Sequence, residues 1–354
     1  RIRRRRYTGR RTLLRGITLP PPTGKSLFDL EAQFHDEAGA ERYFINKRWP
    51  DGPHCPECGS VKVYDSRLRS RRLTRFKCYD CRHQFTVTSG TVMEGTKLPL
   101  GKWMKAYHRI GGSKKGIPAR QLARELGIGL RPAWHLGHRI RASMTENGQR
   151  FAHGTVEADE SYIGGKRKGR GRGYRGNKIA VLGIVERAHG VGGGKGGKGR
   201  RHRYSGAECT NECPGRVQTI ALGGDADRVD GRTIGPHLRK HTDPETTRLM
   251  TDESPIYDKL GEGFRSHETV NHSLKEYART DPMTGRLIST NAAEGMFANL
   301  KRQITGTHHS VSKRHLPRYL EEHDHRYNNR DKTDVDITEA AIGNMEGKRV
   351  KLFK

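Results

Sequence analysis

The sequence predicts an α/β fold with a mixed sheet in its second half, preceded by a small metal-binding region and by a helical region. Three observations support this prediction. Two Cys-x-x-Cys pairs lie between residues 55 and 81, a spacing typical of a metal site. Residues 96–150 carry the apolar periodicity and the Gly and Pro signals of short helices. After residue 154, three strand-like segments precede alternating helix and strand, which favours a mixed sheet.

The composition predicts a nucleic-acid partner. The chain has 354 residues, enough for two or three domains, and its 68 Lys and Arg against 39 Asp and Glu give a net charge of +29. This excess is spread along the whole chain, which favours a polyanionic partner over an ordinary enzyme with a solvated basic surface or tail.

The apolar segments are too short for a membrane protein. The longest, residues 179–185, suits a buried strand and falls far below the roughly 18 residues that span a bilayer. No signal-peptide pattern is present, so we expect a cytoplasmic protein with no membrane partner. In that reducing compartment, paired cysteines indicate a metal site rather than disulfides.

The two ends of the chain are predicted to lie outside the main domains. Residues 1–25 are rich in Arg and end in a Pro run, which is typical of a disordered basic arm. Residues 26–48 are expected to form an N-terminal helical segment. Residues 331–354 are expected to form a C-terminal tail.

Residues 49–95 are predicted to form a zinc ribbon. Each Cys-x-x-Cys brings two thiolates to one ion, and two such pairs supply a tetrahedral set. Four thiolates leave no position open for water or substrate, so the zinc is expected to be structural. The predicted ligands are Cys55, Cys58, Cys78 and Cys81. Cys209 and Cys213 have no second pair and give only a weak metal signal.

Residues 96–150 are predicted to form a helix-turn-helix-like DNA-binding region. Pro118 suits a first helical turn, Gly127 ends that helix, and a second helix is expected to start near Pro132. Arg139 and Arg141 on this second helix complete the outline of a DNA-binding motif. A plain helical hairpin fits the same spacing.

Residues 151–330 are predicted to form the α/β domain. The expected strands are 155–165, 178–187, 216–225, 247–252 and 267–273, and the expected helices are 231–241 and 289–304. Residues 189–216, between the second and third strands, form a basic Gly-rich insertion.

Three acids of this domain are expected to share a site. Asp159 lies inside the first strand, on the face opposite Val156 and Ala158, where an acid needs a positive partner. Asp252 ends the strand 247–252, where α/β sheets commonly place active groups. Its competitors are Asp225 and Asp227, while Glu253 points the other way.

The third acid lies on the helix 289–304. An apolar stripe of this helix packs on the sheet, while Glu294 and Lys301 lie two turns apart on a neighbouring stripe. Asp159, Asp252 and Glu294 together predict the acidic triad of an RNase H-like fold. Three carboxylates suit two Mg²⁺ or Mn²⁺ ions, which activate the attacking oxygen and stabilise the leaving one in phosphodiester chemistry.

Seven ordered motifs within about residues 28–330 carry a family resemblance. They read WPDGPHCPECGS, FKCYDCRHQFTVTSGTVME, VEADESYIGGK, TDESPIY, HETVNHSLKEY, TNAAEGMFANLKRQITGTHHSV and HLPRYLEEHDHRYNNR. The sequence resembles bacterial insertion-sequence DDE transposases with an N-terminal zinc ribbon, the ISXO-like group. The resemblance implies that Asp159, Asp252 and Glu294 bind the catalytic metal ions and that Lys301 is the basic residue after the last acid, with Asn291 as an alternative third ligand.

The resemblance also implies a function. Such a protein binds the terminal inverted repeats of its element as double-stranded DNA, cleaves there and transfers the strand to target DNA, as a homo-oligomer. Pro132, the insertion at 189–216, and His325 in place of an aromatic depart from the family pattern. A non-catalytic zinc-ribbon regulator of DNA, which leaves the triad unused, and an inactive relic remain as alternatives.

Overall fold

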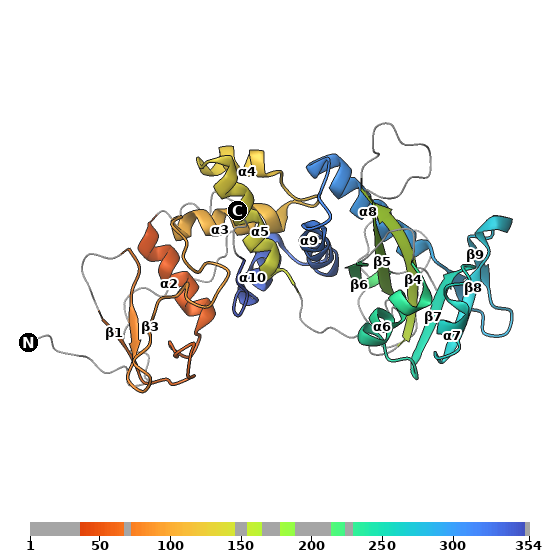
Figure 1. Ribbon diagram of the computed structural model, residues 1–354, viewed down its shortest axis with the longest axis horizontal. Coiled ribbons are helices and arrows are strands. Elements are labelled where there is room, and N and C mark those ends of the chain that lie inside the picture. Colours follow the sequence, from red (N-terminus) through yellow and green to blue (C-terminus); the bar gives the residue numbers. More distant parts are fainter. Residues whose placement is uncertain are drawn as a thin grey trace, which may run out of the picture. The chain divides into compact units, whose positions relative to one another are not determined.

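The computed structural model describes residues 36–66, 72–145, 154–164, 178–187, 214–223 and 229–350. The chain divides into two compact units (Figure 1). The first combines Arg1–Thr145 with Lys332–Lys354, and the second is Glu146–Asp331. Among the described helices, none combines the length and apolar character needed to cross a bilayer.

Several predicted features lie outside the described residues. These are the basic arm at 1–25, the start of the segment 26–48, the insertion at 189–216 except for its end, and the side chains of Cys209, Cys213, Asp225 and Asp227.

Helix α2 and a three-stranded antiparallel sheet make up the cysteine region. The helix spans Glu37–Arg48, and β1, β2 and β3 span Val63–Asp65, Phe76–Cys78 and Gln84–Phe85. Trp49 packs edge-on against Phe76 and Phe85, with ring centroids 5.6 and 5.8 Å away. Because the strands are so short, these aromatic contacts supply the core that backbone pairing alone lacks.

Three helices follow the cysteine region: α3 (Leu100–Gly112), α4 (Ala119–Leu126) and α5 (Leu130–Ser143). Pro118, expected in the first turn of this helix, is the N-cap residue just before α4. As predicted, the helix ends at Gly127, whose φ of +57° is left-handed and suits glycine. Pro132 lies in the first turn of α5, where no intrahelical N–H is lost, so this departure from the family pattern is compatible with the helix.

The two arginines predicted to mark the DNA-binding helix are buried, which corrects that expectation. Arg139 donates hydrogen bonds to the backbone carbonyls of Val92 and Glu94, and its guanidinium lies 5.0 Å from the Trp103 ring centroid. Arg141 is only 4% exposed. Both arginines therefore stabilise the core of the first unit instead of facing DNA.

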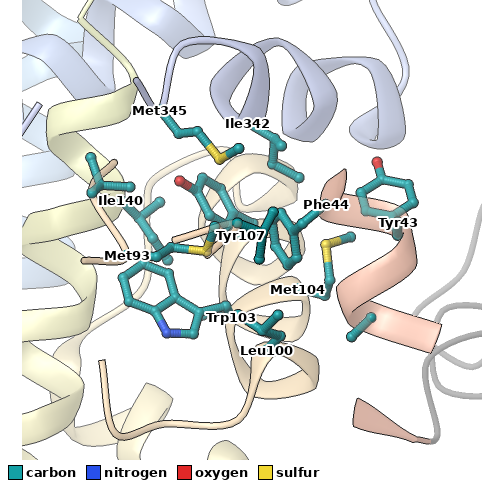
Figure 2. Close-up of a cluster of buried hydrophobic side chains, with 14 of the residues drawn as sticks. Tyr43, Phe44, Met93, Leu100, Trp103, Met104, Tyr107, Ile140, Ile342 and Met345 are labelled. Carbon is teal, nitrogen blue, oxygen red and sulfur yellow. The ribbon is translucent and has the colours of Figure 1, made fainter. Parts of the chain in front are cut away.

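The segment expected as a C-terminal tail contains helix α10 (Asp334–Gly343) and belongs to the first unit. Thr333 and Asp336 form a capping box at its start. Figure 2 shows Ile342 and Met345 packed beside Tyr107 of α3, with Phe44 of α2 in the same cluster. These residues close a core that α2, α3 and α5 cannot complete alone.

The second unit is built on a five-stranded mixed sheet with the order β6-β5-β4-β7-β8. β5 runs antiparallel to both β4 and β6, whereas β4, β7 and β8 are parallel. The strands span Gly154–Ile163 (β4), Ile179–Arg187 (β5), Pro214–Ala221 (β6), Thr247–Asp252 (β7) and Ser266–Val270 (β8). The α/β fold with a mixed sheet, predicted as RNase H-like, is thus confirmed.

Helices cover both faces of this sheet. On one face, α8 (Asn291–Gln303) and α9 (Leu316–Asn328) pack against Val181 and Val185 of β5. On the other face, α6 (Gly231–His241) and α7 (Asp258–Gly261) form a second core with β4 and β5. The alternating side chains of each strand explain the two separate cores.

The edge strand β6 is covered by α9, a helix that the sequence analysis did not delimit. Asp324 accepts hydrogen bonds from the N–H and the hydroxyl of Thr219, at 2.7 and 2.8 Å. One turn later, Asn328 accepts the N–H of Val217 at 2.7 Å. Two side chains of one helix thus pair the edge groups that would otherwise need another strand.

Candidate functional site

The four cysteines meet in one cluster, as predicted. Their sulfurs lie within 4.8 Å of one another, with Cys55 Sγ 3.5 Å from Cys81 Sγ and Cys58 Sγ 3.6 Å from Cys78 Sγ. A tetrahedral ion with Zn–S bonds of about 2.3 Å requires sulfurs roughly 3.8 Å apart. The cluster therefore fits a single zinc ion.

Local backbone geometry brings the two cysteine pairs together. Gly59 follows the first pair with φ +72°, and Arg82 follows the second with φ +64°. Such left-handed residues close the tight turn that lets both thiolates of a pair reach one ion. Burial opposes ionisation of Cys78, yet the backbone N–H groups of Cys81 and Asp80 outweigh it and lower its pKa to about 7. A thiolate is the form that binds zinc.

The three predicted acids lie on three elements of the second unit. Asp159 is in β4 and Asp252 ends the adjacent parallel strand β7. Glu157 pairs with Met250 in this ladder, so the register continued by two residues places Asp159 opposite Asp252. Glu294 lies in the first turn of α8, which covers this face of the sheet.

The carboxylate of Asp159 is affected by the charges of the other two acids. Burial, the largest cause, together with the charges of Asp252 and Glu294 raises the pKa of Asp159 to about 6. The ligand atoms of the three acids are spaced more widely than those of the four cysteines, whose sulfurs all lie within 4.8 Å of one another. Three carboxylates with oxygen donors fit a hard divalent cation such as Mg²⁺ or Mn²⁺.

A glycine in β5 makes room for the helix that carries Glu294. Gly183 is the direct partner of Asp159 in the β4–β5 ladder. A Cβ at this position would lie 2.4 Å from Met296 Cε and 2.8 Å from the Phe297 ring, both on α8. The missing side chain therefore allows α8 to approach the sheet at the level of Asp159.

The remaining candidates of the sequence analysis take different positions. Lys301 is exposed on α8, two turns after Glu294, and Asn291 is the first residue of that helix. Glu253 accepts a hydrogen bond from the Ser273 N–H at 3.2 Å. His325, which departs from the family pattern, is buried in α9.

One residue near the acids was not identified from the sequence. His272 begins a 3-10 turn, η1 (His272–Leu274), that follows β8. Its Nδ1 lies 3.6 Å from Glu294 Oε1 and its Nε2 lies 3.3 Å from the Thr290 hydroxyl. Its position just past the end of a strand parallel to β7 is the one signal that suggests proximity to Asp252.

Comparisons with known proteins find a matching family in each of the two regions. The family described as "ISXO2-like transposase domain" matches residues 151–328, and the family described as "Transposase zinc-ribbon domain" matches residues 35–84. A relative from Halobacterium salinarum, "Uncharacterized protein in transposable element ISH50", is 27% identical over 304 residues, which cover 81% of this chain and 89% of the relative. The first match spans half of the chain and contains all three acids, and the chain therefore belongs to the ISXO2-like transposase family.

Proposed function

We propose that this protein mobilises its own insertion sequence by cleaving and joining DNA. It would bind the terminal inverted repeats as double-stranded DNA, cleave at their ends and join the exposed 3′-hydroxyl to target DNA. The observation that supports this proposal is the arrangement of the three acids: the β4–β7 register continued by two residues places Asp159 opposite Asp252, and Glu294 lies in the first turn of the helix on this face of the sheet.

Asp159, Asp252 and Glu294 are proposed to hold two Mg²⁺ or Mn²⁺ ions. When bound, such ions activate the attacking oxygen and stabilise the leaving oxygen of a phosphodiester. The chain itself contributes orientation. The N–H of Glu160 donates to Asp159 Oδ1 at 2.7 Å, and the N–H of Ser254 donates to Asp252 Oδ1 at 3.1 Å. Each carboxylate thus keeps its other oxygen for an ion.

Lys301 is proposed to bind a DNA phosphate near the scissile bond. It is exposed on the same helix as Glu294, with a full positive charge that suits a phosphate. This role is positional, so its loss should impair cleavage less than loss of an acid.

The zinc ribbon and helices α3–α5 are proposed to recognise the transposon ends. Arg120 and Arg124 on α4 and Arg131 in the first turn of α5 are exposed, unlike Arg139 and Arg141. In helix-turn-helix proteins, the first residues of the second helix reach the DNA bases. We further propose that the active form is a homo-oligomer that holds two DNA ends.

A nicking assay distinguishes this function from that of a DNA-binding regulator or an inactive relic. The substrate is a duplex that carries the inverted repeats flanking the reading frame, incubated with the zinc-loaded protein and Mg²⁺. A transposase nicks at the repeat boundary, and chelation of Mg²⁺ stops the reaction. Specific binding with no nick under any divalent cation would instead favour the regulator or the relic.

A further inference from the structure

We propose that Glu157 and Glu160, which flank Asp159 in β4, are positioning residues for the other two acids. Glu157 tethers the segment that carries Glu294, and Glu160 tethers the segment that follows Asp252. This inference rests on the proposed function, because it assumes that the three acids hold metal ions.

The tether from Glu157 is a fully buried ion pair. Glu157 is 0% exposed, and its Oε1 lies 2.8 Å from Arg187 Nε of β5. Its other oxygen accepts the N–H of Ala293 at 2.9 Å, one residue before Glu294. A buried carboxylate is tolerated only when it is paired and hydrogen-bonded, and here both oxygens are satisfied.

Glu157 replaces a missing local cap on α8. The N-cap residue Thr290 makes no side-chain hydrogen bond to the helix, although the first N–H groups of a helix have no intrahelical partner. A carboxylate from β4 supplies that partner and also interacts favourably with the positive end of the helix. The start of α8 is therefore fixed by the strand that carries Asp159.

Arg187 extends this tether to the segment that leads into α8. A short hairpin, β9 (Ala278–Thr280) and β10 (Leu287–Ser289), precedes the helix. The Arg187 guanidinium donates to the carbonyl of Leu287 and, at 3.0 and 2.7 Å, to the carbonyl and hydroxyl of Ser289. The chain is thus held on both sides of Thr290, which limits how far Glu294 can move from Asp159.

The tether from Glu160 acts on the opposite face of the sheet. Its Oε1 accepts a hydrogen bond from the hydroxyl of Tyr257, which is completely buried among the side chains of the second core. Tyr257 lies five residues after Asp252 and closes a turn through its N–H to the Ser254 carbonyl at 3.0 Å. The N–H of Ser254 in turn binds Asp252, so this contact fixes the loop that orients the second acid.

Three like charges that share a site repel one another, so their spacing must be imposed by the surrounding structure. Partners that orient metal ligands typically change metal affinity 10- to 100-fold when they are mutated. Glu157 lies on the same face of the sheet as Asp159, and Glu160 lies on the opposite face. The two tethers give each of these acids a role. One acid of β4 is the proposed ligand, and the other two hold the segments of its partners.

The test measures binding of Mn²⁺ to the zinc-loaded protein by direct titration, without DNA. Glu157→Gln and Tyr257→Phe should each weaken Mn²⁺ binding about tenfold. Tyr257→Phe keeps the ring in the core and removes one hydroxyl, so it tests the tether from Glu160 even if Glu157→Gln does not fold. Asp324→Asn is the matched control, because it alters a buried carboxylate that binds the edge strand β6 and the neighbouring His323, and none of the acids of the proposed site. It should lower the thermal unfolding temperature and leave Mn²⁺ affinity within twofold of wild type.

Two outcomes would overturn the positioning role. In one, Glu157→Gln and Tyr257→Phe bind Mn²⁺ as well as wild type does. In the other, Mn²⁺ affinity falls in all three variants in step with their unfolding temperature, which means that the tethers act only on stability. If wild type and Asp159→Asn bind Mn²⁺ equally, the proposed metal site itself fails, and the positioning role fails with it.

Discussion

At the residue scale, the site places the buried carboxyl group of Asp159 near two other acids, and this disfavours its ionisation. Burial and the carboxylates of Asp252 and Glu294 all raise the pKa of Asp159, to about 6. Because the pKa is raised in the folded state, the carboxyl contributes stability that is fully present below its ordinary value of 3.8 and is lost as the pH rises through 6. A cation bound between the acids would compensate their negative charge and favour ionised Asp159.

The raised pKa of Asp159 predicts how stabilisation by Mn²⁺ depends on pH. In metal-free protein, ionisation of Asp159 should lower the free energy of unfolding by up to about 3 kcal/mol between pH 4 and pH 7. Mn²⁺ should therefore raise the thermal unfolding temperature clearly at pH 8 and little at pH 5, where protons compete for the site. Asp159→Asn should abolish the difference. An equal shift at both pH values would contradict this explanation.

Loss of a single cysteine ligand is expected to release the zinc and to destabilise the first unit. Cys78 lies in β2 and is itself part of the core, so Cys78→Ser should lose the ion and unfold the aromatic cluster around Trp49. Metal analysis should find about one zinc per wild-type chain and none in this variant. Cys209→Ser is the control and should keep the zinc. Native protein without zinc would refute the ribbon assignment.

At the scale of elements, local sequence signals were sufficient to predict helices and strands whose bounds are set by residues of the same segment. The bounds of α6 and β7 were predicted from the sequence, and the structure shows that Asp230 caps α6 and that β7 ends at Asp252. The hairpin β9–β10 and the buried state of Arg139 were not predictable in this way. Both depend on partners far along the chain, such as Arg187 for β10 and Trp103 for Arg139.

The same limit applies to the candidate site. Asp159 was predicted from its face of a strand, Asp252 from its place at the end of a strand and Glu294 from its stripe of a helix, and the family resemblance implied the same three acids. Glu157 and Glu160 received no role, because alternation along a strand shows the face of a side chain but not its partner. Arg187 and Tyr257 are 30 and 97 residues away from those acids.

The approach of α8 to the sheet gives an element-scale prediction. In Gly183→Ala the new methyl group meets Met296 and Phe297, so the variant should lose about 1–3 kcal/mol of unfolding free energy. Gly295→Ala is the matched control, because a Cβ there meets no atom within 4 Å and alanine favours a helix. Chemical denaturation should rank Gly183→Ala below wild type and Gly295→Ala at or above it. The reverse order would show that α8 does not depend on this glycine.

At the scale of the whole molecule, the net charge of +29 sets how the protein meets DNA. Lys and Arg that contact phosphates release counterions from the duplex, so affinity should fall steeply with salt, by about tenfold or more between 50 and 200 mM. Binding titrations at several salt concentrations measure the slope. Arg131→Ala should reduce the slope, whereas Arg141→Ala, at a buried position, should act mainly on stability. A flat salt response would mean that the charge serves another partner.

We propose that three acids from β4, β7 and α8 hold the metal ions needed for DNA cleavage, and the cleavage rates of substituted proteins test this proposal. Cleavage rates on the inverted-repeat duplex are compared for wild type, Asp159→Asn, Asp252→Asn, Glu294→Gln and the neighbouring control Glu253→Gln. The three triad variants should bind DNA as wild type does and lose cleavage by several orders of magnitude, because each substitution removes a charge that the ions require. Glu253→Gln should cleave within a few-fold of wild type. If Asp252→Asn cleaves normally while Glu253→Gln is inactive, or if none of the substitutions matters, the metal site proposed here is wrong.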